Sequence, residues 1–366
     1  MKREPAIVVI GATGYTGALV ARELWRSPAP HDPPVILAAR DPARLAAVAE
    51  EVGAGATQTV DVTDPSSLNA LIQPGDAVIN TAGPFTELGE PVIRACIRAG
   101  AHYLDTTGEQ PFMRAMRERH HTAAETAGVA VVNAMAFEYA LGDCAAAVAA
   151  EGLVTPVRSL DVFYAWGGAA SSVGTRRTVL RMLGRKAYVR RDGRFRLRPP
   201  GFRHRTVRLA SGRTLHAVAF GAGEVVTVPR YLETTEARGW MVMRSTTARL
   251  VPVVAPILPL VIPILRPLLE PLVARKPDPT PAERENSAFT IRVELEGPDG
   301  TRRAAEVQGT DPYGLTAAAT VRGARRAMAP DAPAGVLAPA QLLRPRTFLD
   351  SLAPRGVRLV LEPTPR

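Results

Sequence analysis

The first residues whose types and spacing could do chemistry are three glycines near the start of the chain. An apolar, β-branched run over residues 6–10 leads into Gly11, Gly14 and Gly17, and apolar residues then recur at helical spacing. A strand, a glycine turn and a helix in this order are typical of a dinucleotide site, because N–H groups at a helix N-terminus bind phosphate. The spacing is GxxGxxG rather than GxGxxG, so a turn that serves only helix packing is the alternative. The residues expected to bind the cofactor here are Gly11, Thr13, Gly14, Tyr15, Thr16 and Gly17.

The end of the second predicted strand, residues 35–39, indicates which dinucleotide is bound. NAD sites usually place Asp or Glu there for the ribose 2′-hydroxyl, whereas NADP sites place cations there for a 2′-phosphate. This strand ends in Arg40, and Arg44 follows one helical turn later. The planar guanidinium group suits phosphate. We therefore expect NADPH, with a surface arginine at a strand end as the alternative.

Polar side chains that follow the fifth and sixth predicted strands are candidates for catalysis. Reduction by a nicotinamide often needs a proton donor near the hydride. Tyr139 suits that role because its phenol is neutral at pH 7, and Glu109 or Glu138 could orient it. Each of the three could equally cap a helix. No His or Cys spacing indicates a metal site.

The first 150 residues must form the elements that position these side chains. Strands are predicted at 6–10, 35–39, 58–62, 76–81, 102–105 and 129–133, and helices between them include 42–52, 90–99 and 111–127. Alternating strands and helices predict a parallel, doubly wound sheet of Rossmann type. Ligands of such sheets bind at the carboxyl ends of the strands. The expected cofactor site therefore includes the residues after the fourth strand, namely Thr81, Ala82, Gly83 and Pro84.

The second part of the chain has shorter, alternating segments that predict a mainly antiparallel sheet covered by helices. Strands are predicted at 159–165, 206–209, 214–220, 224–228, 288–296 and 303–308, hairpin tips at 190–194 and 297–300, and helices at 173–183 and 316–328. The expected fold class is thus α/β: a Rossmann domain over 1–150 and an α+β substrate or oligomerisation domain over 151–366. The segment from about 335 to 366 is a candidate to pack back on the first domain.

Several motifs in combination resemble one family. The glycine run and residues 38–40, 80–85, 89–92 and 102–109 are similar to the saccharopine dehydrogenase-like reductases, especially the branch with the trans-acting enoyl reductases of lipid and polyketide synthesis. The likeness continues more faintly at 168–175, 278–284 and 309–317. It implies an NADP-binding Rossmann domain followed by an α+β substrate domain. One departure is that residues 136–141 read Ala-Phe-Glu-Tyr-Ala-Leu where this branch tends to carry a Gly-Phe-Asp-Ser-Ile-Pro-like stretch.

The resemblance implies an NADPH-dependent oxidoreductase that reduces a C=C bond conjugated to a carbonyl, in a free or carrier-bound lipid or polyketide intermediate. An alternative is C=N reduction in amino-acid or natural-product metabolism, for which Arg176 or Arg177 could bind a substrate carboxylate. An alternative of another class is a protein that binds NADPH, or bridges a synthase complex, without turnover.

A basic run raises the question of partners. Fourteen Lys or Arg residues and one acid lie between Arg176 and Arg213, which accounts for most of the net charge of +10. No nucleic-acid motif accompanies the run, so we expect no nucleic-acid partner. The run is either a solvated face or a surface for an acyl carrier protein, the phosphates of a CoA thioester or an anionic membrane.

An apolar stretch at residues 250–273 is the other unusual segment. Its prolines at 252, 256, 259, 263, 267 and 271 oppose a regular helix, and its uncharged part is short for a membrane span. A substrate lid, a homodimer contact, a patch on lipid and simple core packing are all open. The two cysteines form no ligand cluster, and a strand from residue 6 leaves no room for a signal peptide. We expect a cytoplasmic protein, with peripheral membrane attachment left open.

Overall fold

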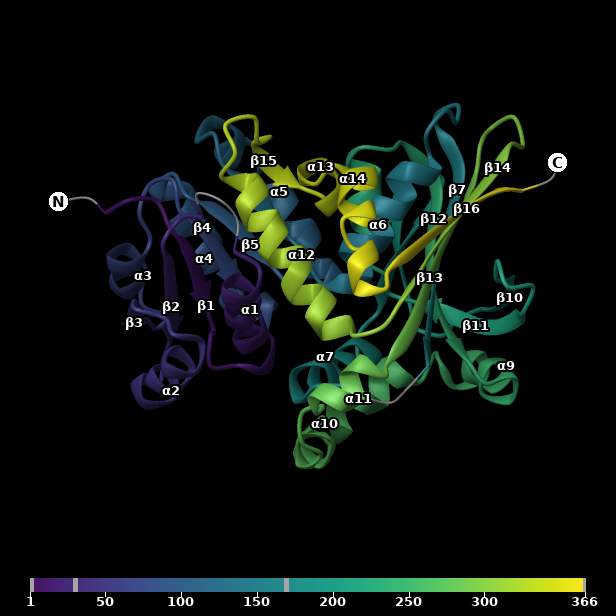
Figure 1. Ribbon diagram of the computed structural model, residues 1–366. Coiled ribbons are helices and arrows are strands. Elements are labelled where there is room, and N and C mark those ends of the chain that lie inside the picture. Colours follow the sequence, from purple (N-terminus) through teal and green to yellow (C-terminus); the bar gives the residue numbers. More distant parts are fainter. Residues whose placement is uncertain (1–2, 29–31, 168–170, 365–366) are drawn as a thin grey trace. The chain divides into compact units, whose positions relative to one another are not determined.

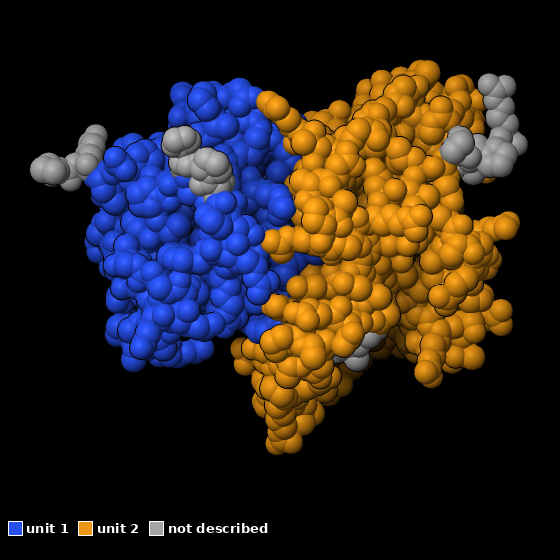
Figure 2. Space-filling view, in the orientation of Figure 1, with its two compact units in different colours: residues 1–107, 111–137, 313–343 blue, residues 108–110, 138–312, 344–366 orange. Residues whose placement is uncertain are grey.

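The computed structural model describes residues 3–28, 32–167 and 171–364, and the chain divides into two compact units (Figure 2). Unit 1 comprises residues 1–107, 111–137 and 313–343, and unit 2 comprises residues 108–110, 138–312 and 344–366. This division differs from the expected boundary at residue 150, because the chain leaves unit 1 after residue 137 and returns to it at residue 313. Of the segment 335–366, residues up to 343 belong to unit 1 and the rest to unit 2.

Unit 1 is built on a seven-stranded sheet in the order β15-β6-β5-β4-β1-β2-β3, with every neighbouring pair parallel (Figure 1). The apolar strand residues are buried, as is typical of a parallel sheet covered on both faces. The order reverses between β1 and β4, so the predicted doubly wound Rossmann-type sheet is confirmed. Its strands are β1 (Ile7–Ile10), β2 (Val35–Ala39), β3 (Thr57–Thr59), β4 (Ala77–Asn80), β5 (His102–Asp105), β6 (Ala130–Val132) and β15 (Gly335–Leu337).

Most helices of unit 1 follow the prediction, but three have an end that differs by several residues and one was not predicted. The helices are α1 (Tyr15–Arg26), α2 (Pro42–Val52), α3 (Pro65–Leu71), α4 (Phe85–Ala99), α5 (Gln110–Thr126), α12 (Pro312–Ala327) and α13 (Pro339–Leu342). Helix α4 begins five residues before the predicted start, because Phe85 packs into the core and Pro91 is accommodated inside the helix. Helix α3 ends at Leu71 rather than near Gly75.

Unit 2 is built on a nine-stranded sheet in which β7 (Val157–Gly167) lies between β12 (Thr234–Met243) and β13 (Ala288–Glu296). Only the β7–β12 pair is parallel among the pairs of described strands in this sheet, which confirms the mainly antiparallel prediction. Asp192 and Gly193 have positive φ at the predicted hairpin tip. The other strands are β8 (Ala187–Arg191), β9 (Arg194–Arg198), β10 (His204–Arg208), β11 (Thr214–Phe220), β14 (Arg302–Gly309) and β16 (Arg358–Thr364).

Two predictions for unit 2 are wrong. Residues 224–228 form no strand, because Glu224–Thr227 is a fully buried helical turn, α8. The proline-rich stretch is helical, as α9 (Ser245–Val254) and α10 (Leu258–Arg275). On α10 the prolines repeat every four residues. A proline has no N–H, so the carbonyl four residues before it has no intrahelical donor, and here that carbonyl belongs to the preceding proline. The unpaired carbonyls therefore fall along one face of the helix.

The remaining helices of unit 2 are α6 (Phe137–Ala149), α7 (Val173–Leu183), η1 (Val228–Arg230), α11 (Pro281–Glu285), α14 (Pro345–Asp350) and η2 (Ala353–Arg355). Helix α7 has the predicted bounds and is capped by Ser172. Residues 168–170 of the faint motif at 168–175 lie outside the described residues.

Candidate dinucleotide site and buried acid cluster

The turn between β1 and α1 has room only for glycine at two of its three glycine positions. Gly11 has φ +82°, and a Cβ there would lie 2.7 Å from the Thr81 hydroxyl oxygen. A Cβ on Gly17 would lie 2.2 Å from the Gly11 carbonyl oxygen. The first glycine therefore makes the turn, and the third lets α1 pack against it.

Gly14 has a different role, because it is exposed and lies at the N-cap of α1. It carries no side chain that could accept a hydrogen bond from the first turn of the helix. The positive N-terminal end of this twelve-residue helix is therefore open to solvent, because Gly14 has no side chain to cover it. This arrangement fits a bound phosphate. Thr13 and Thr16 are half-buried beside it.

Tyr15, the first residue of α1, packs edge-on against Tyr313 at the start of α12, with ring centroids 5.0 Å apart and planes at 83°. Both residues belong to unit 1. The motif at 309–317 therefore contributes a ring beside the glycine turn, although about three hundred residues separate it from Tyr15. Its faint likeness to a family motif was the only sequence signal for it.

Thr81, at the end of β4, braces the glycine turn from the neighbouring strand. Its hydroxyl oxygen lies 2.9 Å from the Ile10 carbonyl oxygen and 3.2 Å from that of Gly11, so it donates to the turn itself. The side-chain oxygen Oδ1 of Asn80 accepts from the Ala82 N–H at 3.0 Å. Ala82, Gly83 and Pro84 then form the surface loop that leads into α4.

Arg40 and Arg44 are exposed beyond the carboxyl end of β2. Arg44 Nη2 donates to the Thr13 carbonyl oxygen at 3.1 Å, which holds this guanidinium against the glycine turn. The nearby acid, Asp41, accepts from the N–H groups of Ala43 and Arg44 at 3.0 and 3.1 Å and so caps α2. The residues present fit a dinucleotide with a 2′-phosphate, since the carboxylate is used by the cap and the cations are exposed.

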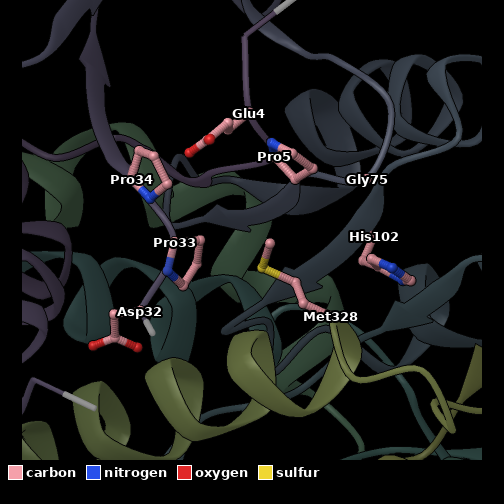
Figure 3. A pocket seen from close by; sticks show the side chains of 8 residues that line it. All are labelled: Glu4, Pro5, Asp32, Pro33, Pro34, Gly75, His102 and Met328. Atoms are coloured by element: carbon pink, nitrogen blue, oxygen red, sulfur yellow. The ribbon is translucent and has the colours of Figure 1, made fainter. Parts of the chain in front are cut away.

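A hollow of about 620 Å³ in unit 1 lies at the amino ends of the strands, opposite the glycine turn (Figure 3). The lining contains two acids, Glu4 and Asp32, and Asp32 forms an ion pair with Arg325 at 2.6 Å. Its position and its negative charge do not suit a dinucleotide. It is lined by Glu4, Pro5, Asp32, Pro33, Pro34, Gly75, His102 and Met328.

Asp105, the last residue of β5, is fully buried and organises the ends of two strands. Its carboxylate accepts from the N–H groups of Thr107 and Ala134, both at 3.0 Å, and from Asn133 Nδ2 at 2.8 Å. Burial nevertheless raises the pKa of Asp105 to about 6. Three donors hold this carboxylate in the core, so we assign it a structural role.

The catalytic candidates belong to unit 2, where Tyr139 lies in a buried cluster with Tyr164 and Glu224. The two tyrosine rings pack edge-on at 6.3 Å, and the Tyr164 hydroxyl donates a short hydrogen bond to Glu224 Oε2. Glu224 Oε1 has no hydrogen-bond partner among the described residues. A Cβ on Gly142 would lie 2.0 Å from that oxygen, so only glycine leaves room for it.

The other two candidates lie close to Tyr139 in sequence or in space. Glu138 precedes it in the first turn of α6. Glu109 is half-buried next to Gly108, where a Cβ would lie 3.0 Å from the Tyr139 hydroxyl oxygen. The segment after β5 thus lies near Tyr139, whereas Tyr164 and Glu224 were not predicted. The Gly-Ala-Gly sequence before Glu224 is a turn signal that could have argued against a strand there.

Burial sets the protonation of this cluster. It raises the pKa of Glu138 to about 7 and that of Glu224 well above its ordinary value. Burial, together with the charges of Glu138 and Glu224, raises the pKa of Tyr139 well above its ordinary value. The cluster thus holds protons on groups that include a carboxylic acid and a phenol at neutral pH.

Among the residues that the structure describes, no group of three or more His, Cys, Asp or Glu side chains is placed to hold a metal ion.

The strand order, the glycine turn and the two arginines define a dinucleotide-binding protein of Rossmann type. Residues 7–132 match the family model described as saccharopine dehydrogenase NADP binding domain. The resemblance predicted from the motifs is confirmed.

Two relatives carry the same likeness over the first part of the chain. A trans-acting enoyl reductase of Mycobacterium leprae is 36% identical over 141 residues, and a saccharopine dehydrogenase-like oxidoreductase of Arabidopsis thaliana is 36% identical over 150 residues. Each match covers 37% of this chain and 33% of the relative, so the chain matches a third of the length of these proteins.

The likeness in fold extends over the whole chain. Saccharopine dehydrogenase (L-Glu forming) from Saccharomyces cerevisiae superimposes with a TM-score of 0.65 over 99% of this chain and 100% of that one, at 14% sequence identity. Both the Rossmann-type sheet and the mainly antiparallel sheet therefore belong to the saccharopine dehydrogenase fold.

Proposed function

We propose that the protein is an NADPH-dependent oxidoreductase that reduces a C=C bond conjugated to a carbonyl in a lipid or polyketide intermediate. The observation that carries the cofactor choice is the pair Arg40 and Arg44 beyond β2, with the intervening acid used as a helix cap. The trans-acting enoyl reductase relatives support the choice of reaction.

The glycine turn, Arg40 and Arg44 would hold NADPH, which would supply the hydride for the β-carbon of the substrate. The enolate that results needs a proton at the α-carbon, and we assign that donation to Tyr139, whose raised pKa keeps the phenol protonated at neutral pH. Glu138 and Glu224 are the adjacent acids that can return a proton to it. One hydride and one proton complete the reduction.

The substrate class is tested by titrating the protein with NADPH and NADH by fluorescence, followed by NADPH consumption with an enoyl thioester and a cyclic imine. The proposal expects selective NADPH binding and turnover of the enoyl thioester. Tyr139→Phe should keep NADPH binding and lose about 10²–10⁴-fold in kcat, the usual contribution of a positioned proton donor. Unchanged kcat in this variant would remove Tyr139 from the mechanism.

Imine reduction is the second candidate, and the structure gives it less support than the sequence did. Arg176 is one of the two arginines expected to bind a substrate carboxylate. Its Nε donates to the Val273 carbonyl oxygen at 2.8 Å, and its other guanidinium nitrogens donate to further backbone carbonyls. Only Arg177 is exposed. Turnover of the cyclic imine alone would favour this candidate, and NADPH binding without any turnover would favour a binding or scaffold role.

A further inference from the structure

Helices α9 and α10 of unit 2 carry a continuous exposed apolar face. On α10, Leu260, Ile264, Leu268 and Leu272 repeat every four residues, which places them on one side of the helix. Between 52% and 76% of each side chain is exposed, and no residue of α10 is buried. The face continues on α9 and the bend, where the large exposed side chains are Leu250, Val253, Val254 and Ile257.

The opposite side of this segment is held against unit 2. Val273 of α10 accepts from Arg176 of α7, and Ile262 packs on Gly184 at the end of α7. Ala248 and Ala255 are fully buried, at the start of α9 and just after it. The segment is therefore fixed on unit 2 with its apolar face turned outward, at the end of the unit where Figure 1 places α7 and α10 together.

Cations lie at both ends of the apolar segment. Arg244, Arg249, Arg275 and Lys276 are all exposed, and Glu270 is the only acid between residues 244 and 276. Glu270 already lies 3.8 Å from both Arg181 and Arg266. Helix α7 adds exposed Arg177, and the residues just after it add exposed Arg185 and Lys186. An aliphatic face with cations beside it complements an anionic bilayer, because the aliphatic side chains can contact the acyl chains while the cations contact the phosphates.

The same features disfavour a protein partner. Residues 244–276 contain no Phe, Tyr or Trp, although aromatic side chains are enriched at the centres of protein interfaces. A symmetric contact with a second copy would bring the same cations against one another. No single described helix is long and apolar enough to cross a membrane. The helices α9 and α10 reach the necessary length and apolarity only as a pair, and they are bent by 101° relative to each other.

We propose that α9 and α10 seat unit 2 on an anionic lipid bilayer, with the Leu260, Ile264, Leu268 and Leu272 side chains among the acyl chains and the cations beside them at the phosphates. The helices lie in the interface and do not cross it. This attachment is independent of the reduction proposed above.

The test is co-sedimentation of the full chain with vesicles of phosphatidylcholine alone and of an equimolar mixture with phosphatidylglycerol. The wild type should bind the mixed vesicles and bind neutral ones weakly. The double variant Ile264→Gln/Leu268→Gln should lose at least about tenfold in partitioning, because two large apolar side chains no longer enter the bilayer. Arg275→Gln/Lys276→Gln should lose about tenfold on the mixed vesicles only.

A matched control is Val154→Gln/Leu361→Gln, which changes two exposed apolar side chains elsewhere on unit 2 and should bind like the wild type. NADPH titration and thermal unfolding check that each variant is folded. The proposal is overturned if folded wild type fails to sediment with the mixed vesicles, or if the control loses as much binding as the α10 variant. It is also overturned if wild type is a dimer without vesicle binding and the α10 variant is a monomer, since the face would then be a protein interface.

Discussion

At the scale of single residues, we expect the choice between NADPH and NADH to depend on Arg40. Arg40→Ala should weaken NADPH binding by about 10- to 100-fold, because a charge-assisted hydrogen bond to phosphate contributes about 1.5–3 kcal/mol. NADH has no 2′-phosphate, so its affinity should stay the same. Fluorescence titration with both nucleotides measures the change, and Arg94→Ala, which alters an exposed arginine of α4, is the control. An equal loss for NADPH and NADH would refute the 2′-phosphate contact.

Glu138 links the stability of the protein to pH. Its pKa is about 7 in the folded protein against an ordinary value of 4.5, so the folded state retains a proton that the unfolded chain has already released. The free energy of unfolding should therefore fall as the pH rises from about 4.5 to about 7, and stay at its lower value above that. Because the side chain is only partly buried, we expect a loss of about 1–3 kcal/mol from a shift of this size.

The variant Glu138→Gln should remove this dependence. Denaturant unfolding at pH 5 and pH 8 should show wild type and variant alike at pH 5 and the variant more stable at pH 8. Glu50→Gln, at an exposed glutamate of α2, should leave the pH dependence of wild type intact. Parallel stability curves for wild type and Glu138→Gln would contradict the raised pKa.

At the scale of elements, the start of α2 connects helix capping to cofactor binding. Asp41→Ala removes the acceptor for two N–H groups and should cost about 0.5–2 kcal/mol of stability. It should also weaken NADPH binding, because the same turn holds Arg40 and Arg44. Asp41→Asn should restore most of the stability, since asparagine is an equally good cap. Thermal unfolding and NADPH titration measure both effects, and normal NADPH affinity in a destabilised Asp41→Ala variant would separate the cap from the site.

Local signals explain which elements could be predicted. The strand β2 and the helix α2 have the predicted bounds because an apolar run ends at Arg40 and an Asp-Pro start follows it. By contrast, β15 has three residues and pairs with β6, about two hundred residues earlier, so no local pattern announces it. The α8 turn at Glu224–Thr227 has β-branched residues, and its burial overrides their strand preference.

The candidate site likewise has parts that local sequence signals predict and parts that depend on tertiary packing. The glycine turn and the two arginines could be predicted because their chemistry lies within one strand-turn-helix segment. The contact of Tyr15 with Tyr313 and the hydrogen bond of Tyr164 to Glu224 join residues far apart in sequence. They depend on tertiary packing, which the residue pattern alone does not encode. The proline-rich stretch is helical, against the prediction, because the regular spacing of its prolines outweighs the donor that each one removes.

At the scale of the whole molecule, the return of residues 313–343 to unit 1 has a measurable effect. A fragment of residues 1–150 lacks β15 and α12, and seven apolar side chains of α12 are almost completely buried, namely Leu315, Ala317, Ala318, Ala319, Val321, Ala324 and Ala327. We expect this fragment to unfold without a cooperative transition and to bind NADPH weakly. Thermal unfolding by circular dichroism compares it with the full chain. A cooperative transition and full-chain affinity in the fragment would show that unit 1 is complete without its last segment.

The late position of β15 in the sequence also affects when the sheet of unit 1 can be completed during synthesis. The ribosome finishes β6 at Val132 and must add about two hundred residues before Leu337 can complete the sheet. At about 5–20 residues per second this interval is on the order of 10–40 s. Throughout it the nascent sheet has β6 as an unprotected edge, and unit 2 has most of its chain available first. We therefore expect the sheet of unit 1 to be completed only after most of unit 2 has been translated.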